Sequence, residues 1–568
     1  MSFINEKIVE EKTCRKCSAL FHITDKDLEF YEKVSPVFNW EKYSVPSPTL
    51  CPDCRQQRRF AFRNENKIYK NTSNISGEDI ISVYHPESEY KPASVEEWYG
   101  DNWSWFDIGR DIVFNNSIFS QIDNLIKNIP HIWRYITKST NSDYCNACAH
   151  VRDCYLCFNS DDLDECYYCY TTNSSQKSFD MSFSKSVENS YFGVNLTWCH
   201  STFYCVNSEW CSESWFLSNC INCKNCFMCS NLANKEYCIE NKQYTKEAYL
   251  KKKDEILNSK LKEDLYKDFI IFESTFPKRA MTSKQTENST WENLSQVKDS
   301  QNIFDSFEVE NCKNCWYVFH AKNCMDYDIY GDHSELIYEN IMVWTHAYKS
   351  LFSIANWNTS NNMIYSFMVD WCSDCFGCAG LKNAQYCILN KQYTKDEYEI
   401  LVPKIIEHMS KTWEWWEFFP ASMSPFGYNE TIANEYFPLE KQDAVDSWFK
   451  WSDYASPPPQ VKKIIPAYKL PSSISDIPDD ILAWAIECEV TKKPFRIIKE
   501  ELEFYRKYNL SIPRKHPDQR HLDRIKFRNP IDTFERKCDK CDKNIKSSYA
   551  PERTETVYCE ACYNKAIY

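Results

Sequence analysis

The sequence predicts a multidomain, β-rich protein in which small cysteine-paired modules at the two ends flank two blocks of short stacked β-coils, each block followed by a helix. Three observations support this class. Cys-x2-Cys pairs gather near both termini, a twelve-residue repeat runs through the middle, and glycine is scarce, at 8 of 568 residues. With 43% hydrophobic residues, the chain has enough apolar material for several packed cores.

The N-terminal module is expected over residues 1–90, which contain two pairs, Cys14 with Cys17 and Cys51 with Cys54. A tight turn within each pair points both sulfurs at one position, so two pairs supply four thiolates to a tetrahedral zinc ion. The alternative, buried free cysteines, is disfavoured by the paired spacing. The sequence therefore predicts a zinc-ribbon or treble-clef module.

The C-terminal module, residues 487–568, repeats this arrangement with Cys538, Cys541, Cys559 and Cys562. Its spacer of 17 residues is compact, which makes it the stronger of the two signals. Catalytic zinc keeps a coordination position open, whereas four cysteines close the shell. We therefore expect structural zinc at both ends.

An internal duplication relates the two ends, because LEFYEKVS and CPDCRQQRR in residues 28–63 correspond to LEFYRKYN and HPDQRHLDR in residues 502–528. In the later copy one metal site is degenerate, with Cys488, Thr491, His516 and Gln519 at the ligand positions. In the earlier copy, Asn71 and Asn74 are expected where the later copy has Cys538 and Cys541. Each end then retains one of two sites, and we expect two bound zinc ions rather than four.

Basic residues accompany the second pair in both copies. The candidate nucleic-acid contacts are Arg55, Arg58, Arg59, Arg63, Arg514, Lys515, Arg520, Arg524, Lys526 and Arg528. Arginines on a metal-fixed turn can meet phosphates. The alternative, which we favour, is a solvated or acid-paired surface, because aspartate and glutamate are plentiful nearby.

Block 1, residues 142–241, repeats with a period of twelve. One column holds small side chains, at Cys154, Cys166, Ser178, Ser190, Thr202, Ser214, Cys226 and Cys238. The next column is almost wholly aromatic, at Tyr155, Tyr167, Phe179, Tyr191, Phe203, Trp215, Phe227 and Ile239. Columns in constant phase are what the stacked coils of a β-solenoid require. Left-handed turn positions are expected at Asn159, Asn195, Asn207, Asn219 and Asn231, which explains the scarcity of glycine.

The small column is expected to point into the coils and the aromatic column outward. The aromatic ladder could stack on bases or sugars, but we favour packing against another part of the chain, because an exposed apolar strip is a liability. The cysteines of the repeat alternate with Ser, Thr, Val and Leu, so we interpret them as core fillers. Metal binding and disulfides remain the alternatives.

Block 2, residues 302–390, is expected to be a decayed solenoid, because its interior from 325 to 371 loses clean phase. Helices are expected over about 245–267 and 395–418, the second opened by a capping box of Thr394 and Glu397. Such helices would cover the open ends of the coils. The remaining segments are an aromatic-rich connector at 91–141, a helix and linker at 242–301, a helix at 391–419 and a linker at 420–486.

Charge and hydropathy limit the expected partners and cellular location of the protein. The net charge of −14 argues against a chain coated in nucleic acid, although residues 487–568 carry 19 Lys and Arg against 14 Asp and Glu. The charged N-terminal stretch and the lack of a long apolar run argue against an export signal and a membrane span. We therefore expect a cytoplasmic protein with reduced cysteines.

Four stretches carry a resemblance to a known group: TLCPDCRQQRRFAFRNE, CFGCAGLKNAQYCILNKQYTKDEY, SPFGYNE (424–430) and ELEFYRKYNLSIPRK. The chain resembles a family of uncharacterised zinc-ribbon or treble-clef proteins from candidate-phylum (Patescibacteria-type) bacteria over nearly its whole length. The resemblance implies terminal cysteine pairs around Cys-rich aromatic repeats, with the eight terminal cysteines as the site residues. It implies no activity.

The leading functional hypothesis is a non-enzymatic scaffold with structural zinc at both ends, which binds an unidentified protein or nucleic acid. The alternatives are a nucleic-acid-binding protein or nuclease using the basic modules, and a redox or metal-cluster protein using the Cys-rich repeats. Asp332 and His333 are the nearest approach to a catalytic pair, and we interpret them as a turn.

Overall fold

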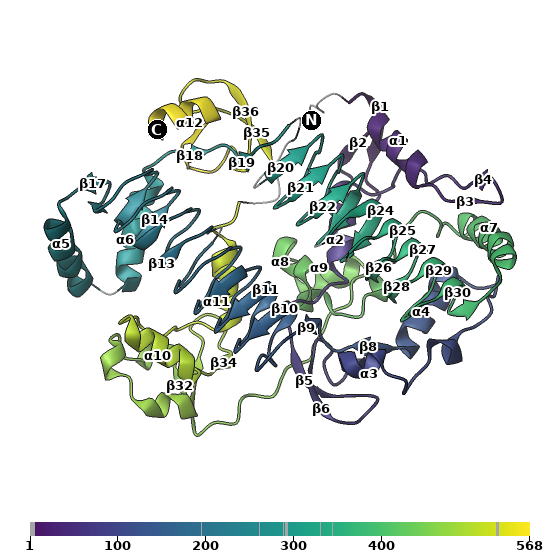
Figure 1. Ribbon diagram of the computed structural model, residues 1–568, viewed down its shortest axis with the longest axis horizontal. Helices are drawn as coiled ribbons and strands as arrows, with labels where there is room; N and C mark the ends of the chain where they lie inside the picture. Colours follow the sequence, from purple (N-terminus) through teal and green to yellow (C-terminus); the bar gives the residue numbers. More distant parts are fainter. Residues whose placement is uncertain are drawn as a thin grey trace. The chain divides into compact units, whose positions relative to one another are not determined.

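The computed structural model describes residues 6–567 except 195, 261, 288, 290–293, 330, 344 and 530–532. The chain forms two compact units, each made of two separate stretches (Figure 1). Unit 1 comprises Met1–Arg134 and Met281–Tyr454, and unit 2 comprises Tyr135–Ala280 and Ala455–Tyr568. The N-terminal module therefore shares a unit with block 2, and block 1 shares a unit with the C-terminal module.

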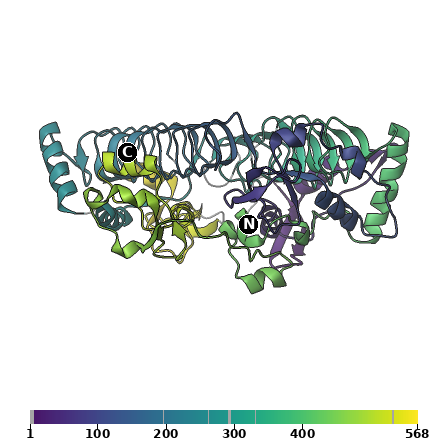
Figure 2. The ribbon, with the colours of Figure 1, turned by 90° about the horizontal axis from the view of Figure 1, so that it is seen from below.

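Block 1 forms a row of short parallel strands in which each residue pairs with the residue twelve positions later, as Leu163 does with Ser175 (Figure 2). This offset equals the period of the sequence repeat. An antiparallel strand, β17, closes the row. The strands are β9 (Ile136–Thr137), β10 (Asn146–Arg152), β11 (Phe158–Asp164), β12 (Asn173–Gln176), β13 (His200–Phe203), β14 (Ser212–Ser218), β15 (Phe227–Ser230), β16 (Cys238–Ile239) and β17 (Lys242–Gln243).

A left-handed backbone corner recurs at every third residue of block 1. From Ala147 to Glu240, each described residue in this series has a φ between 48° and 62°. Four corners of three residues make one twelve-residue turn of chain. The residue after each corner is buried throughout positions 148–229, so this series of residues, spaced three apart, fills the interior. All fourteen cysteines of block 1 fall on it, at 145, 148, 154, 157, 166, 169, 199, 205, 211, 220, 223, 226, 229 and 238.

The asparagines expected at left-handed positions are confirmed at Asn159, Asn207, Asn219 and Asn231, whereas Asn195 lies outside the described residues. The expectation was too narrow, however. Corners are also occupied by bulky residues such as Tyr168 and Trp198. The pairing with neighbouring turns must therefore offset the steric cost, about 1–2 kcal/mol, of a left-handed residue other than glycine.

The outward aromatic column is covered from within unit 2, as we expected. Helix α10 (Lys499–Lys507) places Phe504 against Phe179, with ring centroids 3.9 Å apart. Tyr508 packs against Phe203 at 4.9 Å. These rings belong to one apolar cluster with Tyr505. The ladder therefore forms a core rather than an exposed surface for bases or sugars.

Block 2 is a second row of parallel strands, and its loss of phase has a specific cause. Pairing begins with an offset of eleven, as in Ser283 with Leu294, and changes to twelve, as in Val309 with Ala321. It then lengthens to thirteen, as in Ile337 with Ser350, and returns to twelve. Single inserted residues thus lengthen three turns without interrupting the row. The strands are β19 (Ser283–Lys284), β20 (Leu294–Lys298), β21 (Phe307–Glu310), β22 (Phe319–Lys322), β23 (Met325–Asp328), β24 (Ser334–Ile341), β25 (Tyr348–Leu351), β26 (Ile354–Asn356), β27 (Asn361–Ile364), β28 (Phe367–Val369), β29 (Ser373–Phe376), β30 (Gln385–Ile388) and β31 (Lys391–Gln392).

Helices follow both blocks. After block 1 there are two, α5 (Lys246–Ser259) and α6 (Lys262–Ser274), where we expected one. After block 2, α7 (Lys395–Lys411) begins with the expected capping box of Thr394 and Glu397. It ends before the aromatic run at 413–419, earlier than we expected. Tyr249 of α5 and Tyr398 of α7 are both buried against the last turns of their blocks.

Unit 1 also contains small elements that surround block 2. They include segments that we expected to be connectors: α4 buries Ile122, and the stretch 420–454 buries Tyr428 and Phe449. These apolar side chains pack, so neither segment is a free linker. The elements are β1 (Ile8–Thr13), β2 (Leu20–Thr24), α1 (Asp25–Val34), β3 (Val37–Phe38), β4 (Glu41–Lys42), α2 (Pro52–Phe60), β5 (Tyr69–Thr72), β6 (Asp79–Ser82), β7 (Lys91–Ala93), α3 (Val95–Tyr99), α4 (Ile118–Asn128), β8 (Pro130–Ile132), α8 (Ile432–Tyr436) and α9 (Lys441–Asp446).

Unit 2 ends with the C-terminal module, whose last strand pairs with a strand that follows α6. The remaining elements of the unit are β18 (Lys278–Arg279), β32 (Lys463–Pro466), β33 (Trp484–Glu487), β34 (Pro494–Phe495), α11 (Pro517–Ile525), β35 (Phe534–Lys537), β36 (Asn544–Ser547), β37 (Val557–Tyr558) and α12 (Glu560–Ile567). Within the described part of the chain, no helix is both long enough and apolar enough to cross a bilayer.

The interior column predicts how its cysteines respond to substitution. Cys229 is fully buried, and its Sγ lies 3.3 Å from the Phe227 carbonyl oxygen. Ser208, which also follows a left-handed corner, donates to the carbonyl two residues before it, at 3.0 Å. We therefore expect Cys229→Ser to cost less than about 1.5 kcal/mol, and Cys229→Leu to cost about 1–3 kcal/mol through overpacking. Urea unfolding followed by circular dichroism measures both; equal costs would contradict the assignment.

Candidate metal centres

The first centre begins with a tight hairpin between β1 and β2. Cys14 directly follows β1, and its backbone N–H donates to the Ala19 carbonyl at 2.9 Å. The N–H of Ser18, a left-handed residue with φ 62°, donates back to the Cys14 carbonyl at 3.0 Å. This pattern presents Cys14 and Cys17 on the same turn.

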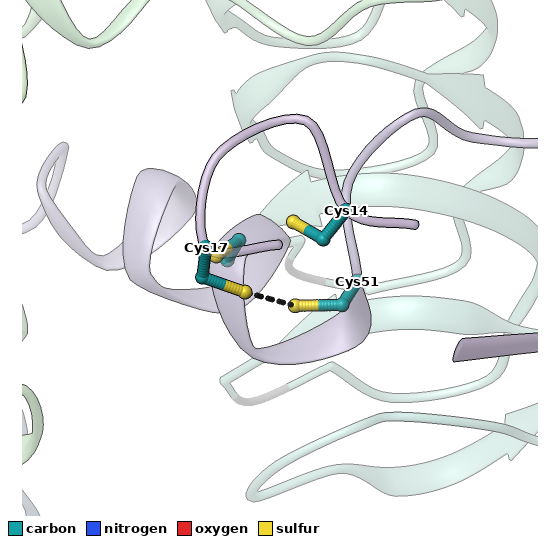
Figure 3. Close-up of side chains that lie close together, drawn as sticks. Cys14, Cys17 and Cys51 are labelled. Atoms are coloured by element: carbon teal, nitrogen blue, oxygen red, sulfur yellow. Dashed lines mark hydrogen bonds between the residues drawn. The ribbon is translucent and has the colours of Figure 1, made fainter. Parts of the chain in front are cut away.

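The other two thiols come from the start of helix α2. Cys51 is the residue that caps the helix, Pro52 is its first residue, and Cys54 lies in its first turn. Figure 3 shows Cys17 and Cys51 facing each other, with their Sγ atoms 3.6 Å apart. The Sγ atoms of all four cysteines lie within 4.8 Å of one another. Zinc–sulfur bonds of about 2.3 Å in a tetrahedron require sulfur separations of roughly 3.8 Å.

The environment of this centre favours a thiolate at Cys51. The Cys54 thiol and backbone N–H lower the pKa of Cys51 to about 5, although burial opposes the shift. The helix N-terminus adds a positive potential. A thiolate at this position is the species that binds a metal ion, so the centre is prepared for a cation.

The second centre repeats this construction in the C-terminal module. Cys538 and Cys541 lie on the turn between β35 and β36, and Cys559 directly precedes α12, which contains Cys562. The Cys541 and Cys559 Sγ atoms are 3.8 Å apart, and all four lie within 4.8 Å. Burial alone would raise the pKa of Cys538, but backbone N–H groups, first that of Cys559, lower it to about 6. Both predicted sets of four cysteines are therefore brought together.

Two more copies of the same hairpin and helix start are present without a full set of cysteines. In each, the first residue of the turn donates to the residue five positions later and accepts from the residue four positions later, as Cys14 does. In the C-terminal module this copy has the expected residues, Cys488, Thr491, His516 and Gln519. In the N-terminal module the corresponding residues are Ser73, Ser76, Ser94 and Glu97.

This register corrects one expectation. Asn71 lies inside strand β5, and Asn74 lies at the second position of the turn, so neither occupies a ligand position. Because this copy has no cysteines, the Asn-x2-Asn spacing of Asn71 and Asn74 was mistaken for its pair of ligand positions. In the actual copy, the Glu97 carboxylate accepts hydrogen bonds from Ser73 Oγ and the Ser94 N–H, both at 2.7 Å. An internal carboxylate thus holds together a turn and a helix that thiolates and a metal would otherwise join.

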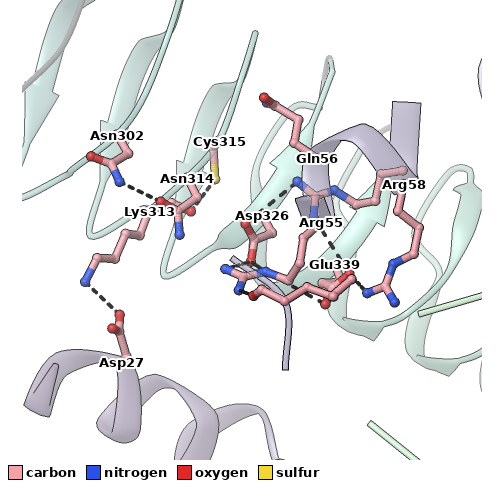
Figure 4. Close-up of polar contacts among 12 residues, drawn as sticks. Asp27, Arg55, Gln56, Arg58, Asn302, Lys313, Asn314, Cys315, Asp326 and Glu339 are labelled. Atoms are coloured by element: carbon pink, nitrogen blue, oxygen red, sulfur yellow. Dashed lines mark hydrogen bonds and ion pairs between the residues drawn. The ribbon is translucent and has the colours of Figure 1, made fainter. Parts of the chain in front are cut away.

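The arginines of helix α2 are buried against carboxylates of block 2 (Figure 4). Arg55 Nε lies 2.7 Å from Asp326 Oδ2. Arg59 pairs with Asp328, and Arg58 bonds Glu339 at 2.8 Å. These ion pairs hold the N-terminal module against the strands of block 2. The arginines could bind a phosphate only if these ion pairs broke.

Helix α11 docks onto block 1 in the same way, although its copy of the hairpin and helix start lacks a full set of cysteines. Arg520 and Arg524 occupy the positions of Arg55 and Arg59 in the duplicated sequence. Their Nη1 atoms lie 2.6 and 2.7 Å from the two carboxylate oxygens of Asp180. Asp180, like Asp326 in unit 1, is a left-handed corner residue. The sequence revealed the paired arginines but gave no sign of their partners.

The other predicted nucleic-acid contacts also have partners inside their own units. Arg63 pairs with Glu65, and both Lys515 and Lys526 contact Asp523. Arg514 donates to the Leu470 carbonyl at 3.3 Å, and Arg528 lies over the ring of Phe183. Arg63, Lys515 and Lys526 thus have carboxylate partners, as the acid-paired alternative predicts, whereas Arg514 and Arg528 contact a carbonyl and a ring.

The cysteines of the blocks differ from the terminal sets in both burial and geometry. They lie inside the coils, with sulfur atoms beside backbone carbonyls, as for Cys205 and Phe203 at 3.3 Å. Burial raises the pKa of Cys205, which keeps its thiol neutral and unreactive. Their local Cys-x2-Cys spacing follows from the three-residue corner period, a signal that was visible in the sequence.

The buried arginine pairs predict an asymmetric effect of removing their aspartates. Asp180→Ala leaves Arg524 buried without a carboxylate and Arg520 with Glu501 as its remaining partner, so we expect a loss of about 3–5 kcal/mol in the stability of unit 2. Asp164→Ala is the matched control, because Asp164 pairs with the exposed Arg152 and should cost less than about 1 kcal/mol. Urea unfolding followed by tryptophan fluorescence compares them. A loss below about 1 kcal/mol for Asp180→Ala would contradict the docking role.

Each complete set can hold one soft divalent ion with four thiolates. Such a shell is closed, so it leaves no position for a substrate or an activated water. A comparison with protein-family models finds no match for this chain, and neither does a comparison with curated proteins.

Proposed function

We propose that this protein is a zinc-binding, non-enzymatic scaffold with one structural zinc ion at each end. The observation that carries this proposal is the presence of two sets of four cysteines, each with all its sulfur atoms within 4.8 Å. Soft thiolates in a tetrahedral arrangement select zinc among the common divalent ions. The hairpin and helix start of each set fit a treble-clef or zinc-ribbon module of the kind that the sequence resemblance implies.

Between these modules, we propose that both blocks are β-solenoids with helices that close their last turns. The parallel pairing at an offset of twelve in block 1 and of eleven to thirteen in block 2, the buried small side chains and the repeated corners support this architecture. Tyr249 and Tyr398 support the closing role of α5 and α7, because both side chains cover the last turn of a block. A row of stacked strands of this kind suits a protein that binds a partner through its surface rather than an enzyme.

The contacts of the basic residues make a protein partner more suitable than a nucleic acid. Arg55, Arg59, Arg520 and Arg524 are engaged inside the units, so phosphates would have to displace carboxylates from buried pairs. The redox alternative is also weakened, because the thiols of the blocks face the coil interior.

Metal analysis of natively purified protein tests the zinc assignment. We expect two zinc ions per chain, and one after Cys541→Ser, because a thiolate of the second set is lost. Cys488→Ser is the control: this cysteine occupies the place of Cys538 in the degenerate copy, and its loss should leave two zinc ions. Iron in place of zinc, together with visible absorbance, would instead support a redox protein.

Chelation tests whether the ions hold the modules together. Prolonged exposure to EDTA should make the stretches 6–60 and 534–567 sensitive to trypsin, while residues 142–241 remain protected by their own hydrogen-bonded turns. Restoring zinc should restore the protection. Unchanged cleavage of both ends after verified removal of the metal would rule out a structural role for the ions.

A further inference from the structure

The lengthened turns of block 2 bring three imidazoles to one corner of the ladder. His320, His333 and His346 follow one another at the thirteen-residue offset, and all three are left-handed corner residues with φ between 43° and 56°. The ring centroids of His320 and His333 are 5.3 Å apart, and those of His333 and His346 are 5.4 Å apart. The backbone ladder therefore fixes the spacing of these rings.

A carboxylate lies between two of these rings. Asp332 Oδ1 is 2.6 Å from His320 Nδ1 and 2.7 Å from His333 Nδ1. One possible ligand atom from each of these residues lies within 4.8 Å of the others. Asp332 belongs to the turn with an inserted residue, and it directly precedes the corner residue His333. The interpretation of Asp332 and His333 as a simple turn therefore misses their shared partner, His320.

A second carboxylate orients one of the imidazoles. Glu308 occupies the same corner one turn before His320, and its Oε2 lies 2.8 Å from His320 Nε2. Because Glu308 holds Nε2, it leaves Nδ1 directed at Asp332. A carboxylate on the far nitrogen of a histidine is the usual support for metal-ligating imidazoles, since it fixes the tautomer and raises the basicity of the ligand.

We propose that this corner is a third metal site, which binds a divalent transition-metal ion through His320, His333 and Asp332. Two imidazoles and one carboxylate suit zinc, cobalt, nickel or iron(II). Three protein ligands leave at least one coordination position open to water, in contrast to the closed thiolate centres. The site is also accessible, because the His333 side chain is 65% exposed.

Metal binding requires only a small rearrangement of this group. Without a metal, Asp332 accepts hydrogen bonds from the two imidazoles at 2.6 and 2.7 Å. Around an ion with bonds of about 2.0–2.1 Å, the same atoms would stand roughly 3.3 Å apart. Rotation of partly exposed side chains supplies this difference, and the ion takes the place of the shared protons.

Titration with Co²⁺ of the full chain, prepared with one zinc ion in each cysteine set and none at this corner, tests the proposal. We expect one Co²⁺ per chain with visible d–d bands and without thiolate charge-transfer absorbance, which would mark exchange into the cysteine sets. His320→Ala and His333→Ala should each abolish this binding. Glu308→Gln should weaken it by about 10–100-fold, the effect of losing a supporting carboxylate.

The matched control is His200→Ala, which removes an exposed histidine of block 1 flanked by Glu188 and Glu213. This variant should bind Co²⁺ as the unmodified protein does. Absence of the additional Co²⁺, or its retention in both His320→Ala and His333→Ala, would overturn the proposal. The zinc content of the same samples reports on the terminal centres separately, so failure of those centres cannot be mistaken for failure of this site.

Discussion

The left-handed corner at every third residue is the constraint on which the rest of the structure depends. It turns the chain so sharply that four corners complete a coil, and the residue after each corner must face a narrow interior. In block 1 only small or slender side chains lie there, which accounts for the cysteines and serines. The bulky side chains are driven outward, and the outward aromatic column of block 1 becomes the surface that a helix can cover.

Docking and metal binding are separable functions of the terminal modules. Helix α11 retains the arginine pair that holds Asp180, although its copy of the hairpin and helix start lacks a full set of cysteines. The copy that contains helix α2 retains both the arginines and all four cysteines. Each unit therefore has one docked copy and one complete set of four cysteines, but only in unit 1 do both belong to the same copy. The buried ion pairs secure the position of a module on its ladder, and the proposed zinc secures the fold of the module itself.

Sequence reasoning was sufficient where spacing alone determines geometry. Two Cys-x2-Cys pairs bind one metal ion only if their four sulfur atoms meet at one position. The two sets were therefore predictable, as Cys14, Cys17, Cys51 and Cys54 at one end and Cys538, Cys541, Cys559 and Cys562 at the other. The twelve-residue period likewise equals the offset between paired residues in block 1, and its aromatic column is the one that unit 2 covers. Corner residues were less predictable, because a backbone held by its neighbours on both sides accepts tyrosine or tryptophan as well as asparagine.

Other features left no local signal. The partners of Arg55 and Arg59 lie about 270 residues away, so the burial of these charges follows from the fold and not from the helix sequence. The inserted residues of block 2 shift the columns by one position and thus resemble decay, although the ladder continues through them. The Ser73 and Glu97 pair is equally hidden, because hydroxyl and carboxylate replacements leave no recognisable spacing.

The division of the chain into interleaved stretches also bears on how the polypeptide is made. Translation delivers the first module long before residues 302–390, the ladder that its arginines require, have left the ribosome. The nascent module must therefore persist for the time needed to synthesise more than two hundred further residues, with Arg55 and Arg59 still hydrated. A bound ion supplies cohesion that needs no distant segment, so early metal capture would protect the emerging chain until its companion surface arrives.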